Sequence, residues 1–179
     1  MKLLLSIVLF ALLPTSSYAE SWPKPQCQGE PYWLEFSTVK LCIPKQNVTH
    51  LNILHSELPS FTITTEHGEV IFQIQTAENI TGGLHSKYEL DLASYFIALK
   101  NKDKPAIDYN IAYQVHELLS PNDIGIFNTG DWLAVSLTNN TRSFDELFIF
   151  NKSSQHILHI GGQFDSLEAK TLLAQFRLP

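Results

Sequence analysis

The sequence is short of cysteines, basic residues and long apolar runs. It has two cysteines in 179 residues, and its 12 lysines and arginines are outnumbered by 18 aspartates and glutamates. The formal net charge of −6 disfavours nucleic acid backbones and anionic membrane surfaces, so we expect neither as a partner. The basic cluster of Lys100, Lys102 and Lys104 is interrupted by Asp103 and is typical of a solvated helix end.

Familiar catalytic and metal-binding motifs are also missing. The sequence has no G-x-S-x-G nucleophile elbow, no H-E-x-x-H zinc motif and no glycine-rich nucleotide fingerprint. Its seven histidines lack zinc spacing, and His156 and His159 would lie on opposite faces of a predicted strand. Two acidic pairs, Asp145 with Glu146 and Asp103 with Asp108, are expected to be solvated. We therefore expect no metal and no cofactor.

The N-terminus has the pattern of a secretory signal peptide. Lys2 precedes an apolar run over residues 3–13, and Ser17-Tyr18-Ala19 fits a cleavage site. The run is too short for a stable transmembrane anchor. We therefore predict cleavage after Ala19 and a single secreted domain over residues 20–179.

The compartment and the organism stay open. The short signal and the modest size favour a bacterial periplasm. The sequence also has four N-x-S/T glycosylation sites, so a eukaryotic secreted glycoprotein is the alternative. These sites are at Asn47, Asn79, Asn139 and Asn151.

The two cysteines, Cys27 and Cys42, predict one disulfide. An exported domain with an even number of cysteines is expected to oxidise them. Their spacing is too long for a C-x-x-C redox motif, and no further cysteine could complete a metal site. The bridge would hold the N-terminal arm of the domain.

The order of hydrophobic patterns predicts an α+β fold with predominantly antiparallel sheet, about three helices packed on it and a C-terminal helix. Period-two alternation marks the strands, and apolar stripes at helical spacing mark the helices. The predicted strands cover residues 32–36, 39–43, 48–54, 61–65, 70–75, 124–127, 132–138, 144–150 and 156–160. The predicted helices cover residues 87–101, with Ser86 and Glu89 as a capping box, residues 107–119, and the segment after Asp165, with Glu168 at its third position.

The most suggestive segment for ligand binding is the glycine-rich stretch before the first long helix. Gly82, Gly83 and His85 could hold an anion or a small ligand, because backbone amides at a helix N-terminus point outward there. A flexible link between a hairpin and a helix is the simpler interpretation. Trp33 and Trp132 are expected in the core.

These observations favour an exported, non-catalytic binding protein with a protein partner, such as an immunity, inhibitor or envelope accessory protein. It would present a flat exposed patch that contains aromatic residues. One alternative is a hydrolase whose dispersed site brings His85 and a distant carboxylate into a concave pocket. The other is a small-ligand carrier with an apolar pocket. Its lining would be Tyr88, Tyr95, Phe72 and Phe148. The oligomeric state is not determined by the sequence.

Overall fold

The computed structural model describes residues 19–27, 29–36, 39–54, 60–65 and 68–179. The predicted signal peptide, up to Tyr18, lies outside these residues, as do Glu66 and His67 between two of the predicted strands. The strands are β1 (Glu20–Ser21), β2 (Pro31–Phe36), β3 (Val39–Pro44), β4 (His50–Leu54), β5 (Ser60–Thr65), β6 (Gly68–Gln75), β7 (Ile124–Thr129), β8 (Trp132–Leu137), β9 (Asp145–Asn151), β10 (Ile157–Gly162) and β11 (Phe176–Arg177). The helices are α1 (Ala77–Thr81), α2 (Leu84–Lys87), α3 (Leu92–Asn101), α4 (Tyr109–Val115) and α5 (Ser166–Ala174), with short 3₁₀ turns η1 (Lys45–Asn47) and η2 (Pro121–Asp123).

The strands form two sheets, and the predicted α+β class is confirmed. The large sheet has the order β1-β7-β8-β9-β10-β6-β5-β4, and the small sheet has the order β11-β3-β2. Neighbouring strands are antiparallel except for β1, whose two residues pair in parallel with β7. The short links between β7, β8, β9 and β10 explain this arrangement, since a parallel crossover needs a dozen or more residues.

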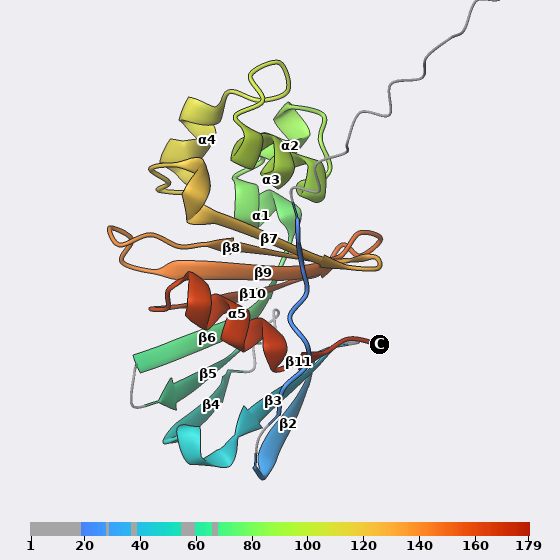
Figure 1. Cartoon of the computed structure of the whole chain (residues 1–179). Helices are drawn as coiled ribbons and strands as arrows, with labels where there is room; N and C mark the ends of the chain where they lie inside the picture. The colour runs from blue at the N-terminus through green and yellow to red at the C-terminus, as the bar shows by residue number, and fades with distance from the viewer. Residues whose placement is uncertain (1–18, 28, 37–38, 55–59, 66–67) are drawn as a thin grey trace, which may run out of the picture.

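The large sheet is the middle layer of the molecule. Helices α1 to α4 cover one face, and α5 with the small sheet covers the other (Figure 1). Alternate residues of β7 to β10 therefore enter two different cores, because successive side chains on a strand point to opposite faces. Ile126 belongs to the first core, beneath α3 and α4, and Phe127 belongs to the second core, above α5 and β3.

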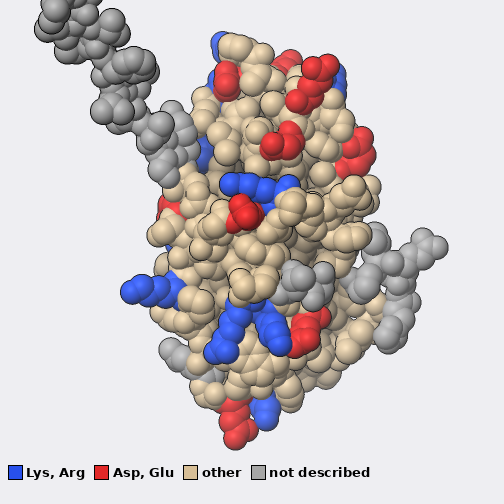
Figure 2. Space-filling model, turned by 90° about the vertical axis from the view of Figure 1, so that its right-hand side faces the viewer, with Lys and Arg blue, Asp and Glu red and all other residues tan. Residues whose placement is uncertain are grey.

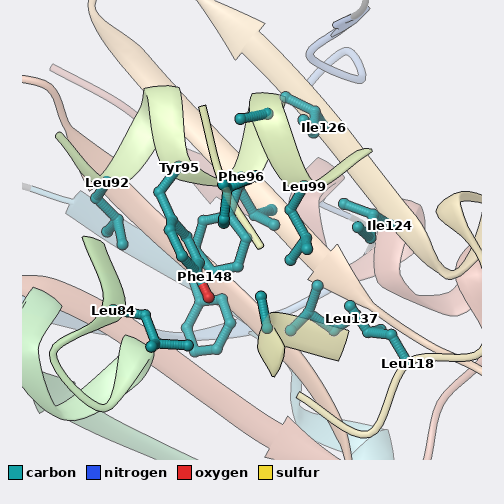
Figure 3. Close-up of a cluster of buried hydrophobic side chains, with 14 of the residues drawn as sticks. Leu84, Leu92, Tyr95, Phe96, Leu99, Leu118, Ile124, Ile126, Leu137 and Phe148 are labelled. Carbon is teal, nitrogen blue, oxygen red and sulfur yellow. The ribbon is translucent and has the colours of Figure 1, made fainter. Parts of the chain in front are cut away.

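The first core is built around α3. Tyr95, Phe96 and Leu99 point from this helix into the cluster that also holds Phe148 of β9 (Figure 3). The rings of Phe96 and Phe148 are stacked with centroids 5.7 Å apart. The apolar stripe in the sequence predicted this helix. Burial of the stripe against the sheet stabilises the helical layer.

The start of this helix is not where the sequence predicted it. Ser86 belongs to the separate helix α2, and Glu89 has a left-handed φ of 56°, so the two do not form a capping box. The cap is Asp91, whose carboxylate accepts a hydrogen bond of 2.7 Å from the backbone N–H of Ser94. The C-terminal helix, in contrast, begins as predicted, with a capping box between Asp165 and Glu168.

The predicted disulfide between Cys27 and Cys42 is present, with their Cα atoms 6.0 Å apart. It ties the N-terminal arm to β3, where Cys42 is buried. The arm is also held by main-chain hydrogen bonds, from Trp22 N–H to Asn128 and from Gln26 N–H to Ala174. The bridge thus connects the small sheet to a segment that is also bonded to β7 of the large sheet and to the end of α5.

Among the described residues, no helix is both long enough and apolar enough to cross a membrane.

Candidate functional site

A groove with a volume of about 810 Å³ lies between the helical layer and the turn that joins β9 to β10. One wall comes from α1, α2 and the beginning of α3, and the other comes from the turn between β9 and β10. The groove contains His85 of the predicted loop, whereas Gly82 and Gly83 shape the chain beside it. We name it the α1–α3 groove.

Gly82 and Gly83 place His85 by turning the chain sharply between two short helices. Both glycines have left-handed conformations, with φ of 58° and 78°. Gly82 ends α1 and Gly83 precedes α2. A Cβ atom at Gly83 would lie 3.0 Å from Oε1 of Glu78, which adds crowding to the backbone strain. The predicted flexible link is therefore a defined reversal that brings α2 back against α1.

The imidazole of His85 is oriented by Thr81, four residues earlier. The Thr81 hydroxyl donates to the carbonyl of Ala77 at 2.9 Å, and it lies 2.7 Å from Nδ1 of His85. Because the hydroxyl proton is already used, the oxygen must accept from Nδ1–H. Neutral His85 therefore carries its proton on Nδ1 and has an unshared electron pair on Nε2.

Two further acceptors lie close to this electron pair. The Glu78 carboxylate oxygen Oε2 is 3.7 Å from Nε2 of His85. The Ser86 hydroxyl is 3.1 Å from the same oxygen and 3.3 Å from Nε2. The Ser86 hydroxyl has a single proton, and its shorter contact is to the carboxylate. A serine nucleophile would instead donate this proton to the histidine that acts as its base.

The rest of the groove combines an apolar floor with one acid and one base. The floor consists of Leu92, Ile97, Phe150 and Ile157. Asp91 stands at the edge as the cap of α3, and Lys152 belongs to the opposite wall. The groove therefore combines polar side chains, among them two carboxylates and His85, with an apolar surface. Among the described residues, no group of three or more His, Cys, Asp or Glu side chains is placed to hold a metal ion.

A second candidate is the outer edge of β4, at the end of the large sheet. All five residues of β4 are exposed, although three of them are apolar: Leu51 is 38% exposed, Ile53 61% and Leu54 57%. In the described part of the chain, β4 pairs only with β5. The strand thus leaves one row of backbone N–H and C=O groups without strand partners.

A third group of polar residues is a buried network around Arg142. Its side chain is 5% exposed, and it donates to the carbonyls of Phe144, at 3.1 Å, and His116, and to Glu146 at 2.6 Å. Glu146 also lies 3.2 Å from Nε2 of His159, and His159 and Arg142 together hold the pKa of Glu146 below its usual value despite burial. Asp145, beside it, accepts from two backbone N–H groups, and burial raises its pKa. The prediction that Asp145 and Glu146 are solvated is wrong.

This network has a structural role. It ties the end of α4 to β9 and β10 and satisfies charges that would otherwise be costly to bury. Asp103 and Asp108 are exposed as predicted, and Asp108 caps α4.

Two other predictions fail, one because the large sheet has two faces and one because β2 is at the edge of the small sheet. Tyr95 and Phe148 belong to the first core and Phe72 to the second, so the predicted carrier pocket does not form. Trp33 was expected in the core but is 41% exposed on β2, with Arg177 stacked on its ring at 4.5 Å from the centroid. β2 is an edge strand, which the sequence pattern did not reveal.

The sequence interpretation also missed Glu78, Thr81 and Ser86 as neighbours of His85. Thr81 ends α1 and His85 belongs to α2, so the left-handed turn at Gly82 and Gly83 brings them together. Helical spacing in the sequence does not predict this contact.

Comparisons with known proteins do not assign a family. No family model and no curated protein matches the chain. A solved structure of a GTP binding regulator from Thermotoga maritima is similar over 70% of this chain and 73% of its own, at 10% sequence identity and a TM-score of 0.30.

Proposed function

We propose that this protein is an exported, non-catalytic binding protein whose partner is another protein, and that an extended segment of the partner pairs with β4. The exposed apolar edge of β4 carries the proposal. Immunity, inhibitor and envelope accessory proteins are the classes that fit such a small domain. The Cys27–Cys42 bridge suits an oxidising compartment outside the cytoplasm.

The side chains of β4 continue the apolar surface of the second core to the edge of the sheet. Ile53 pairs with Phe61, and Leu51 pairs with Ile63, and both partners on β5 are buried. Directly opposed residues in an antiparallel pair lie on the same face. An added strand would therefore extend a face that is already apolar, and it would shield Leu51 and Ile53 from water.

The edge lacks the features that usually prevent strand pairing. Proteins protect exposed edges with lysines, prolines, bulges or very short strands. The sequence of β4, HLNIL, has no Lys, Arg, Asp, Glu or Pro, and its register with β5 is continuous over five residue pairs. Main-chain hydrogen bonds along this edge would supply affinity, and alternate side chains would supply specificity.

The surface charge is consistent with a protein partner and does not favour a polyanionic partner such as nucleic acid. On the described part of the face in Figure 2, acidic side chains gather over the helical end, and basic side chains stand singly or in small groups. Such a mixed surface does not concentrate positive potential as nucleic acid recognition requires.

Site-specific photo-crosslinking tests this proposal. A photoreactive amino acid replaces Ile53 in one variant and Leu167 in the other; Leu167 is a control on α5 that is 68% exposed. We expect one partner protein to crosslink in stoichiometric amounts from position 53 and not from position 167. Binding of the purified partner should then weaken by about tenfold or more in Ile53→Lys, since a charge is placed where an apolar contact forms. Leu167→Lys should bind normally.

Three results would contradict the proposal. Equal crosslinking from both positions would mean that β4 has no special role. Crosslinking of position 53 only to a second copy of the chain would make β4 a dimer contact instead. A partner whose affinity is unchanged by Ile53→Lys would bind elsewhere.

A further inference from the structure

The α1–α3 groove contains His85 and lies apart from β4, since none of its lining residues belongs to that strand. We propose that this groove binds an aliphatic primary ammonium group, with the ammonium between His85 and Glu78 and the carbon chain on the apolar floor. The proposal does not depend on strand addition at β4. It concerns a different face of the sheet and a different class of ligand.

The decisive geometry is the separation of two acceptors. Nε2 of His85 and Oε2 of Glu78 lie 3.7 Å apart, and neither can donate to the other when Thr81 holds the proton of neutral His85 on Nδ1. The Ser86 hydroxyl lies beside both atoms, 3.1 Å from Oε2 and 3.3 Å from Nε2, and its single proton goes to the carboxylate. Nε2 of neutral His85 therefore receives no proton from Ser86 and keeps an electron pair that a ligand donor can use. An ammonium group has three N–H donors and a positive charge, so it can donate to both atoms and complement the carboxylate.

Charge in the groove favours a cation. Glu78 and Asp91 both line it, and Lys152 is the one basic residue among its described lining residues other than His85. Lys152 extends from the turn after β9, on the wall opposite the acids. An anionic ligand would meet the carboxylates of Glu78 and Asp91 in the same groove, and a neutral alcohol would bring no charge to complement them.

The floor favours an aliphatic chain attached to the ammonium. Ile97 is half-buried on α3, and Phe150 and Ile157 present the edges of core side chains to the groove. Ligand sites commonly combine an apolar lining with a few convergent polar groups. The same chemistry is found in a free alkylamine and in a lysine side chain of another protein, and the two sources can be separated experimentally.

Protein-observed NMR titration with matched six-carbon probes tests the ligand class. Hexylamine is expected to bind and to shift the amide signals of Glu78, His85 and Ser86. Butylamine should bind more weakly, by about fourfold for each methylene removed from the floor. Hexanol and hexanoate should bind at least about tenfold more weakly than hexylamine because they lack the cation.

Three variants locate the ammonium. Glu78→Gln should weaken the binding of hexylamine by about fivefold. Glu69→Gln, which changes an exposed acid on β6, should have no effect on this binding. Lys152→Gln should strengthen the binding of hexylamine, since it removes a positive charge that repels the ammonium group. All variants are checked for an unchanged thermal unfolding midpoint before titration.

A lysine model compound distinguishes a free alkylamine from a lysine side chain of a partner protein. Acetyl-lysine methylamide has the same four-carbon stem as butylamine, so tighter binding than butylamine would indicate a lysine of a partner protein. Weaker binding would indicate a free amine. The proposal would be overturned if hexanol bound as tightly as hexylamine or if hexanoate bound more tightly. It would also be overturned if Glu78→Gln and Glu69→Gln changed the affinity for hexylamine equally. Finally, the absence of any signal shift with hexylamine at about 10 mM would overturn it.

Discussion

Ile53 and Phe61 face each other across β4 and β5, yet Ile53 is 61% exposed and Phe61 is 6% exposed. Two apolar residues in one cross-strand pair thus have opposite environments, because Phe61 is covered by the stacked rings of Phe36 and Phe72. The pair marks the place where the second core ends and the exposed apolar edge of β4 begins.

The first prediction compares truncation of these two residues. Phe61→Ala should lower the free energy of unfolding by about 3–5 kcal/mol, since it empties part of a packed core. Ile53→Ala should change it by no more than about 0.5 kcal/mol. Urea denaturation followed by circular dichroism measures both. A cost above about 2 kcal/mol for Ile53→Ala would show that the residue is buried in solution, and dependence on protein concentration would then identify a second copy as the cover.

The sequence predicted the fold where local signals agreed with the tertiary structure. Asp165 and Glu168 form a capping box that needs no long-range information, and α5 follows them as predicted. Alternating apolar residues likewise predicted β5 and β6. The start of α3 was misplaced because Ser86 and Glu89 offer a plausible cap sequence; the helix instead begins after Asp91.

The site was less predictable because it depends on which strands are at an edge. No pattern in β2 or β4 distinguishes an edge strand from a central one, so Trp33 was assigned to the core and Ile53 was not noticed. His85 was identified from its glycine-rich context. Its neighbour Glu78, however, is brought to it by the left-handed turn at Gly82 and Gly83.

The second prediction concerns Arg142. Arg142→Met should lower the free energy of unfolding by about 3–5 kcal/mol, because Glu146 would lose its counter-charge in a largely buried position. Lys40→Met is the matched control, since Lys40 pairs with Glu35 on the surface and should contribute less than about 1 kcal/mol. Thermal unfolding compares the two. If both substitutions lowered the free energy of unfolding by a similar small amount, Arg142 would be solvated rather than part of a network.

The third prediction concerns the disulfide. Replacing both Cys27 and Cys42 with alanine should lower the free energy of unfolding by about 3 kcal/mol, as expected for a closed loop of this length. Reduction of the unaltered protein should produce a similar loss. Denaturation with and without reductant measures it, and thiol titration of the unreduced protein verifies the bridge. Free thiols before reduction would contradict its formation.

The fourth prediction concerns His116, which is buried beside α3 with Nε2 3.0 Å from the Tyr95 hydroxyl. Burial is the main cause that lowers the pKa of His116 from 6.5 to about 4 in the folded protein, with a smaller contribution from Arg142 and an opposing one from Glu146. The neutral imidazole makes this hydrogen bond without placing a charge in the core. A protonated ring would bury a charge there.

The sign of the pH effect follows from this lowered pKa. Between pH 6.5 and about 4 the unfolded chain binds a proton at His116 that the folded chain does not, so stability falls as the pH falls through this window. The loss should be on the order of 3 kcal/mol and should be complete below the folded pKa. His116→Gln, which stays neutral and can still form a hydrogen bond with Tyr95, should remove most of this loss, whereas His50→Gln at an exposed position should not. Urea denaturation at a series of pH values measures all three proteins; an equal slope for the unaltered protein and His116→Gln would place the titrating group elsewhere.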